Sequence, residues 1–311
     1  MSASGIRPTV RALLEEAVGR LTAAGVDTPR VDAEWLLADL LGGGGRAGLW
    51  LRAPESVSGG VVARFDARVE RRVAREPLQQ IVGWTEFRGL RIRVTPDVLV
   101  PRPETELLVE RALTSLPAPS RCRRLAVDLG TGSGAVACAL AQARPDLDVI
   151  AVDVSAAAAR VARDNVADLG LGDRVRVVAS DLGAALRPRP ADLVVANPPY
   201  LTSVTVETLP PEIRDHEPRL ALDGGADGLG LVRRIVRAAP GMLRPGGCLW
   251  LEVAGPDQAA AVQQWLAGAP GLWQKPVVGS DLAGHDRFVG AARAGGAASP
   301  GEGEPFVLER I

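Results

Sequence analysis

The chain is poor in several residue types on which particular protein classes depend. Its 311 residues include only three cysteines, two histidines and one lysine, Lys275. Because Cys122, Cys138 and Cys248 are odd in number and widely spaced, they form neither a disulfide framework nor a metal-ligand pattern, and they are typical of reduced thiols. The sequence lacks an apolar run of about 18 residues and a charged-then-apolar leader, so it predicts neither a membrane span nor a signal peptide. We therefore expect a cytoplasmic protein that holds no metal.

The chain also lacks an excess of charge of either sign. It carries 36 lysines and arginines against 37 aspartates and glutamates, a formal net charge of -1. A protein that holds duplex nucleic acid through its phosphates usually needs a basic face. The composition therefore favours a protein substrate over a stable nucleic-acid or membrane partner. The length is enough for one large domain and a smaller one.

The most informative segment that is present is Asn197-Pro198-Pro199-Tyr200, which directly follows an apolar run at 193–196. The run predicts a buried strand, and two prolines cannot continue it because they supply no N–H and fix φ. The Asn197 side chain is therefore expected at the carboxyl end of a strand, where ligands bind in open α/β sheets. The Asn197 carbonyl and the C=O of Pro198 could each accept one N–H of a planar NH2 group, and Tyr200 could lay its ring against that plane. Taken alone, the four residues would more often be an ordinary Pro-rich turn.

A glycine-rich segment upstream favours a ligand site over an ordinary Pro-rich turn. Asp128 follows the apolar residues 125–127 and precedes a turn made of Gly130, Thr131, Gly132, Ser133 and Gly134, after which an Ala-rich helix is predicted. Glycines allow positive φ and close backbone approach to a ligand, and the helix N-terminus offers unpaired N–H groups. The turn also matches the dinucleotide pattern G-x-G-x-x-G/A. Asp128 favours S-adenosylmethionine instead, because its carboxylate could meet the cationic amino-acid end of that cofactor.

Two further predicted strands end in acids. Asp153 closes the run 149–153 and could accept both ribose hydroxyls, a role that an NAD site would share. Asp181 and Leu182 close the run 175–182 and are expected near the adenine. Acids and a glycine-rich turn at three strand ends, with the Asn-Pro-Pro-Tyr segment at a fourth, predict an S-adenosylmethionine site. An NAD-dependent dehydrogenase is disfavoured because no acid/base pair for hydride transfer accompanies the pattern.

With these residues in view, the chain resembles the HemK/PrmC protein-(glutamine-N5) methyltransferases over roughly residues 8–293. The matching segments are 76–79, 83–87, 100–106, 128–134, 197–200, 217–222, 224–229 and 251–253. The resemblance implies transfer of a methyl group from S-adenosylmethionine to the glutamine of the Gly-Gly-Gln tip of bacterial peptide chain release factors. Asn197, Pro198 and Tyr200 would be catalytic, and Pro199 would complete the substrate-binding segment. Asn197 would also contact the cofactor.

Other functions stay open at this point. Asn-Pro-Pro-Tyr is shared with adenine-N6 methyltransferases, so an exocyclic amino group of a nucleic acid is an alternative acceptor, as is the glutamine of a ribosomal protein. A binding protein that keeps the cofactor site but no longer catalyses is disfavoured by the intact site residues. His216 and His285 are interpreted as loop residues rather than as general bases. The roles of Arg102, Glu217 and Glu252 are left undecided.

The resemblance and the βα alternation together predict a class I S-adenosylmethionine-dependent methyltransferase fold, with a Rossmann-like, mostly parallel seven-stranded sheet. Strands are expected at 125–128, 149–153, 175–179, 192–196, 248–253 and 286–291. Residues 1–76 are expected to form a helical substrate-recognition domain, 77–103 a connector with a β-hairpin, 104–293 the catalytic domain and 294–311 a flexible tail. A row of arginines at 64, 68, 71, 72 and 75 is either a solvated helix face or part of a clamp for the protein substrate. We expect the chain to be a monomer.

Overall fold

The computed structural model describes residues 7–42, 45–185 and 190–295. Of the predicted tail at 294–311, all but the first two residues lie outside that part. Contacts divide the described chain into two units. The first holds the residues up to Trp84 together with Leu209–His216, and the second holds Thr85–Thr208 and the described chain from Glu217 onward. The return of Leu209–His216 to the first unit is not anticipated by the linear division drawn from the sequence.

The first unit is helical, as the sequence predicts. Its α1 (Val10–Ala23) begins where Thr9 Oγ1 accepts a hydrogen bond from Ala12 N at 3.2 Å, and Pro29 opens α2 (Pro29–Leu41) in the position that proline favours. The other helices of the unit are α3 (Gly45–Leu51), α4 (Gly59–Val73), α5 (Leu78–Val82) and α10 (Pro211–Arg214). Apolar stripes of α1, α2 and α4 meet in one core, whose fully buried members include Leu21, Leu36, Leu37, Phe65 and Val69.

The arginine row of the sequence lies on and just after α4, and its best-buried members are bound to acids of the same unit. Arg72 is 7% exposed; its Nε reaches Asp32 Oδ2 at 2.7 Å and its Nη1 reaches Glu212 Oε1 at 3.0 Å. Arg75 Nε lies 2.6 Å from the same Glu212 oxygen. Arg72 is therefore not part of a solvated surface. The two guanidinium groups hold Leu209–His216 within this unit through Glu212.

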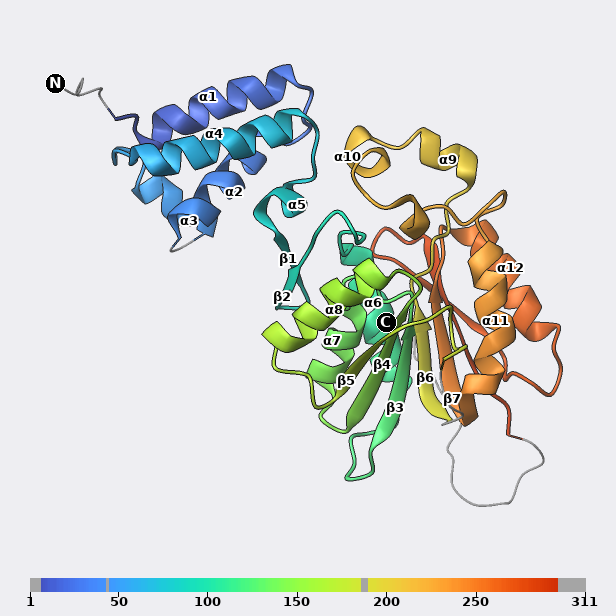
Figure 1. The fold of residues 1–311 in the computed structure, drawn as a ribbon. Helices are drawn as coiled ribbons and strands as arrows, with labels where there is room; N and C mark the ends of the chain where they lie inside the picture. The colour runs from blue at the N-terminus through green and yellow to red at the C-terminus, as the bar shows by residue number, and fades with distance from the viewer. Residues whose placement is uncertain (1–6, 43–44, 186–189, 296–311) are drawn as a thin grey trace. The chain divides into compact units, whose positions relative to one another are not determined.

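The second unit is built on a seven-stranded sheet in the order β5-β4-β3-β6-β7-β9-β8 (Figure 1). The strands are β3 (Arg124–Leu129), β4 (Leu147–Asp153), β5 (Val175–Ala179), β6 (Ala191–Ala196), β7 (Leu243–Glu252), β8 (Val277–Ser280) and β9 (Asp286–Ala292). The strands from β5 to β7 are parallel, and β9 runs antiparallel to both β7 and β8. The predicted mostly parallel seven-stranded sheet is confirmed.

Two details of the sheet differ from the strands expected from the sequence. The short edge strand β8 was not among them, because its four residues are too few to produce a periodic pattern. Strand β7 begins at Leu243 rather than at 248, because Pro245, Gly246 and Gly247 interrupt the apolar run, and Gly246 has φ of 77°. The pairing register between β6 and β7 shifts at that interruption.

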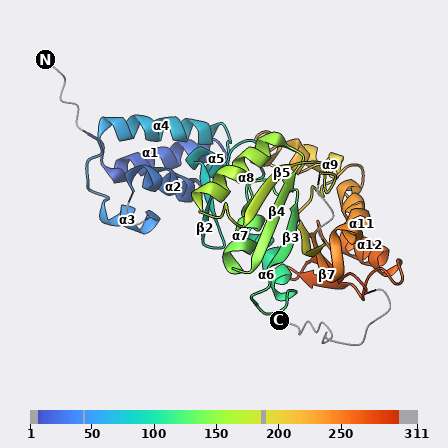
Figure 2. The same ribbon diagram turned by 60° about the horizontal axis from the view of Figure 1, so that its bottom comes forward.

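Helices cover both faces of the sheet (Figures 1 and 2). On one face lie α6 (Pro103–Thr114), α7 (Ala135–Ala143) and α8 (Ala156–Asp168), and on the other lie α11 (Gly230–Met242) and α12 (Pro256–Ala267). Ala126 and Leu193 point toward α6 and α7, whereas Val127 and Val194 point toward α11 and α12. This alternation along buried parallel strands accounts for the continuous apolar runs in the sequence.

The predicted hairpin is formed by β1 (Trp84–Phe87) and β2 (Leu90–Arg93). Its turn places Arg88 and Gly89 at φ 48° and 75°, which matches the turn expected from the sequence. The remaining short elements of the second unit are α9 (Ser203–Glu207) and a 3-10 turn at Arg219–Ala221. Within the described ranges, no helix has the length and apolar character needed to cross a membrane.

Candidate active site

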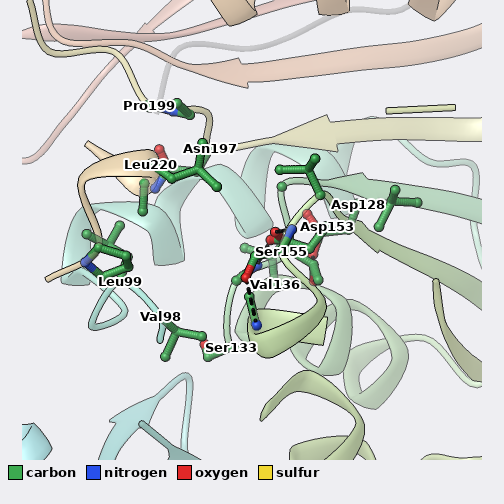
Figure 3. Close-up of a pocket in the computed structure, with 18 of the residues that line it drawn as sticks. Val98, Leu99, Asp128, Ser133, Val136, Asp153, Ser155, Asn197, Pro199 and Leu220 are labelled. Carbon is green, nitrogen blue, oxygen red and sulfur yellow. Dashed lines mark hydrogen bonds between the residues drawn. The ribbon is translucent and has the colours of Figure 1, made fainter. Parts of the chain in front are cut away.

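A cavity of about 370 Å³ lies at the carboxyl ends of β3, β4, β5 and β6. Its lining includes most of the residues that the sequence singles out: Asp128, Gly130, Thr131, Gly132, Ser133, Asp153, Asp181, Leu182, Asn197 and Pro199. Figure 3 shows Asn197 and Pro199 leaving the end of one strand, with Asp128 near the end of the adjacent β3 and Asp153 at the end of β4. The parallel sheet brings these side chains together because all four strands end at the same edge.

The glycine-rich turn between β3 and α7 is shaped by two acids. Gly130 and Gly132 have φ of 72° and 54°, which residues with a Cβ rarely adopt. Thr131 Oγ1 donates to Asp128 Oδ2 at 2.6 Å, and the Gly132 N–H donates to Asp153 Oδ2 at 2.8 Å. Gly134 does not line the cavity; it precedes α7 and packs against Ala162, where an added Cβ would come within 3.1 Å.

Both acids are buried, and no basic side chain among the described residues is bound to either of them. Asp128 is 1% exposed, and burial raises its pKa to about 7 against the opposing effect of the Thr131 hydrogen bond. Burial also raises the pKa of Asp153, whose oxygens accept from the backbone N–H groups of Gly132 and Ser155. Buried carboxylates that accept only from neutral donors favour a cationic or polar ligand in the cavity.

The acid that follows β5, Asp181, is exposed and has a cation partner. Both of its oxygens accept from Arg234 Nη2, at 2.7 and 2.8 Å. Leu182 has φ of 48°, an unusual value that turns the chain beside Asp181. All three residues line the cavity. The sequence predicts Asp181 and Leu182 at the site but gives no indication that Asp181 has a cation partner.

Asn197 is held by a chain of hydrogen bonds that the sequence did not reveal. Asn197 Nδ2 donates to Thr105 Oγ1 at 3.0 Å, and Thr105 Oγ1 donates to Glu252 Oε2 at 2.9 Å. Tyr200 OH donates to Glu252 Oε1 at 3.2 Å. Thr105 comes from α6 and Glu252 from the end of β7. Both lie in segments that carry the family resemblance, which was the available signal for them.

Close backbone contacts fix the path of the Asn-Pro-Pro-Tyr segment. A Cβ on Gly224 would lie 2.6 Å from Pro199 O, and one on Gly228 would lie 2.1 Å from Tyr200 O, so both positions require glycine. Gln258 Nε2 donates to Tyr200 O at 2.9 Å. Pro199 lines the cavity, whereas Pro198 and Tyr200 are not among its lining residues. The glycines of the 224–229 segment thus support the strand-end turn.

Other polar residues considered from the sequence are placed as follows. Arg102 lines the cavity and its Nη2 reaches the buried Glu217 carboxylate at 2.5 Å. His216 Nε2 lies 3.3 Å from Ala74 O within the first unit, and His285 is exposed in the turn between β8 and β9. Neither histidine lines the cavity, so the structure gives neither of them the position of a general base.

The cavity fits S-adenosylmethionine. A positive-φ glycine turn lets the backbone approach a ligand, Asp128 is suited to an ammonium group, and Asp153 is suited to a ribose diol. Together with a parallel sheet that carries antiparallel β9, these features define a class I S-adenosylmethionine-dependent methyltransferase. Comparison with known proteins narrows that class.

Two family models match the chain: the PrmC N-terminal domain over residues 12–83 and the methyltransferase small domain over residues 104–210. The release factor glutamine methyltransferase of Moorella thermoacetica is 45% identical over 92% of this chain and 99% of its own length. That of Deinococcus radiodurans is 44% identical over the same shares of the two chains. The chain belongs to the release factor glutamine methyltransferase family.

Solved structures agree on the fold. The catalytic domain of hMettl16, solved in complex with the MAT2A 3'UTR hairpin 6, superimposes with a TM-score of 0.52 at 17% identity. The match covers 76% of this chain and 82% of that one. At this level of identity the likeness concerns the fold alone.

Proposed function

We propose that the protein methylates N5 of the glutamine in the Gly-Gly-Gln tip of a peptide chain release factor, and that Asn197, Pro198 and Tyr200 present the amide. The observation that carries this proposal is the position of Asn197. It directly follows β6 and lines the same cavity as Asp128 and Asp153, so an amide held there meets the cofactor.

In this proposal each strand end has one task toward the cofactor. Asp128 binds the ammonium group, Asp153 accepts the ribose hydroxyls, and Asp181 with Leu182 borders the adenine. The glycine-rich turn lets its backbone approach the ligand closely. When bound, the cofactor supplies a methyl group that its sulfonium has already activated.

The protein's own contribution is alignment of a weak nucleophile. A carboxamide nitrogen is poorly nucleophilic because its lone pair is delocalised into the carbonyl. The Asn197 and Pro198 carbonyls accept its two N–H groups and draw electron density onto nitrogen, while Tyr200 supports the amide plane. Holding the reacting atoms in line can lower a barrier by about 7–11 kcal/mol in favourable cases. Methyl transfer forms an N-methylated amide cation, which is a strong acid and loses its proton without a dedicated base, so neither histidine is needed.

The proposal extends to partners and location. The helical first unit would recognise the body of the release factor, and the near-zero net charge argues against a stable nucleic-acid partner. We propose a cytoplasmic monomer with no membrane partner. A ribosomal-protein glutamine or an adenine amino group are the other acceptors to test. The names of the relatives favour the release factor.

The test is single-turnover methyl transfer to intact release factor, with a release factor lacking the tip glutamine as the blank. Asn197→Ala should lower the rate at least about 100-fold, because a buried substrate N–H loses its acceptor and alignment is lost as well. Tyr200→Phe should cost less than Tyr200→Ala, since the ring survives. Near wild-type transfer by Asn197→Ala would show that the residue only forms a turn. Preferred transfer to DNA or to a ribosomal protein would refute the substrate.

A further inference from the structure

Glu252 is a buried carboxylate just behind the cavity, and it serves no purpose in the function proposed so far. It is 1% exposed at the end of β7, and both of its oxygens accept from hydroxyl groups rather than from a guanidinium. One hydroxyl belongs to Thr105, which also contacts Asn197, and the other belongs to Tyr200. A position needed only for packing would be better filled by an apolar side chain, because burying a carboxylate between neutral donors is costly.

The hydrogen-bond chain has a direction. Above its pKa Glu252 is ionised and its carboxylate can only accept, so the single hydroxyl proton of Thr105 then points to Glu252. The lone pairs of Thr105 Oγ1 are then the groups that face Asn197, and the partner they require is the amide NH2 at 3.0 Å. The reverse orientation of the amide would set two oxygen acceptors against each other. The carbonyl oxygen of Asn197 is therefore the end of the amide left for a ligand.

We propose that Glu252 and Thr105 are positioning residues for methyl transfer: Glu252 orients the Thr105 hydroxyl, Thr105 orients the Asn197 amide, and Glu252 also anchors the Tyr200 hydroxyl. This inference rests on the proposed role of Asn197 as the acceptor for the substrate amide. It adds two residues, from α6 and β7, that act through Asn197 and decide which atom of Asn197 the substrate meets.

The charge state of Glu252 matters for this direction. Burial raises its pKa to about 7, against the effect of the two hydroxyl hydrogen bonds. Arg287 on β9 lowers the pKa and Glu104 on α6 raises it. The pKa of the Tyr200 phenol is raised by burial and by the charge of Glu252, so Tyr200 stays a donor.

The first test uses Thr105→Val, which keeps the shape of the side chain but removes the hydroxyl. At saturating cofactor and release factor we expect kcat to fall about 10- to 100-fold, because Asn197 Nδ2 loses its partner and the amide is free to turn. KM for the release factor and Kd for S-adenosylmethionine should change less than about threefold. Thr105→Ser should restore most of the rate. Thr114→Val, which removes an exposed hydroxyl bonded to Glu110 O on the same helix, is the matched control.

The second test asks whether Glu252 acts through Asn197. Glu252→Gln offers one acceptor oxygen and one NH2 group, so it cannot accept from both hydroxyls. It should lower kcat about tenfold in the wild-type background but change it less than about threefold in the Asn197→Ala background. Equal losses in both backgrounds would overturn the inference, because Glu252 would then act independently of Asn197.

A spectroscopic measurement shows whether the Glu252 contact is present in each variant. Tyr200 is the only tyrosine of the chain, so tyrosine labelled with 13C at Cζ gives one protein signal. In the wild type this signal should shift with pH as Glu252 titrates, and the shift should vanish in Glu252→Gln. An identical pH dependence in both proteins would refute the Tyr200 anchor.

The outcomes separate this inference from the function it rests on. If Asn197→Ala transfers methyl normally, the proposed role of Asn197 fails. If Asn197→Ala is inactive but Thr105→Val and Thr105→Ser both keep the wild-type kcat, only the positioning role fails. Loss of kcat in Thr105→Val, with rescue by serine and no effect of Thr114→Val, supports it.

Discussion

A buried acid of the first unit and two buried acids at the site of the second unit differ in the groups that bind them. In the first unit Glu212 accepts from Arg75 and Arg72; burial alone would raise its pKa, but these hydrogen bonds lower it to about 2. In the second unit Asp128 and Glu252 accept only from neutral donors, and burial raises the pKa of each to about 7.

This difference shows what each set of acids does. A carboxylate with its own arginine is electrically satisfied and can serve structure, here by holding Leu209–His216 in the first unit. A buried carboxylate without a bound arginine is costly to ionise unless a ligand or a hydrogen-bond network stabilises its charge. Asp128 and Glu252, whose pKa values are raised and which lack a bound arginine, lie at the candidate site, whereas Glu212, whose pKa is lowered by its arginines, serves the scaffold.

The largest effect should come from breaking the arginine pairs of the first unit. Arg72→Met leaves the buried Asp32 without its cation and weakens the hold on Glu212. We expect a loss of about 3–5 kcal/mol in unfolding free energy, because an uncompensated buried charge remains. Urea denaturation followed by circular dichroism measures it.

Two further variants test whether the loss of stability comes from an unpaired buried charge. Arg72→Met combined with Asp32→Leu should recover much of the loss, since no unpaired charge is left at Asp32. Arg93→Met breaks the exposed Arg93–Asp168 pair and should cost no more than about 1 kcal/mol. A small loss in Arg72→Met, equal to that in Arg93→Met, would mean that the pairs of the first unit are not structural.

Cofactor binding compares an acid without a bound arginine, Asp153, with an acid that has one, Asp181, in the same cavity. Asp153→Ala should weaken S-adenosylmethionine binding about 100-fold or more, because it removes a charged acceptor for two hydroxyls. Asp153→Asn, which keeps the shape and one acceptor oxygen, should fall between that variant and the wild type. Calorimetry gives the affinities.

Asp181→Ala is the matched variant, because this acid already has Arg234 as its cation. We expect an effect of about threefold, in keeping with an exposed ion pair. Equal losses in Asp153→Ala and Asp181→Ala would contradict the distinction between acids with and without a cation.

Stability should depend on pH through Glu252. Its pKa is raised from the ordinary 4.5 to about 7, so the folded protein holds a proton that the unfolded chain releases. The associated stability is present below about pH 4.5 and is lost as pH rises to about 7, with an upper limit of about 3 kcal/mol. Urea midpoints between pH 5 and 8 should fall more steeply for the wild type than for Glu252→Gln. Parallel curves would refute the raised pKa.

Much of this site could be predicted from the sequence, because strand ends and turn residues are local signals. Asp128, Asp153 and Asn197 each follow an apolar run, and a parallel sheet then brings them to one edge. Thr105 and Glu252 could not be assigned roles in this way, since their contact joins residues 147 positions apart and neither has a local pattern that marks it.

The same limit applies to the first unit and to the edge of the sheet. The arginine row is plain in the sequence, but the partner Glu212 lies 140 positions from Arg72. Whether a charged row is solvated or paired depends on such distant contacts. Strand β8 was missed for the opposite reason, because four residues at an edge are too short to show a period.

The pH dependence of cofactor affinity gives the sharpest assignment of a single acid. Asp128 must be ionised to bind an ammonium group, and its pKa in the free protein is raised by burial from 3.8 to about 7. Above about pH 7 the Asp128 carboxylate is already ionised. Below it, removing the proton costs about 1.4 kcal/mol more for each pH unit, so the affinity for S-adenosylmethionine should fall about tenfold per unit down to pH 5. Methylthioadenosine, which carries the adenosine but no ammonium group, should bind more weakly and without this slope. Because both ligands meet Asp153, the difference between their slopes isolates Asp128, and Asp128→Asn should remove it. Equal slopes for the two ligands would assign the ammonium contact to another group.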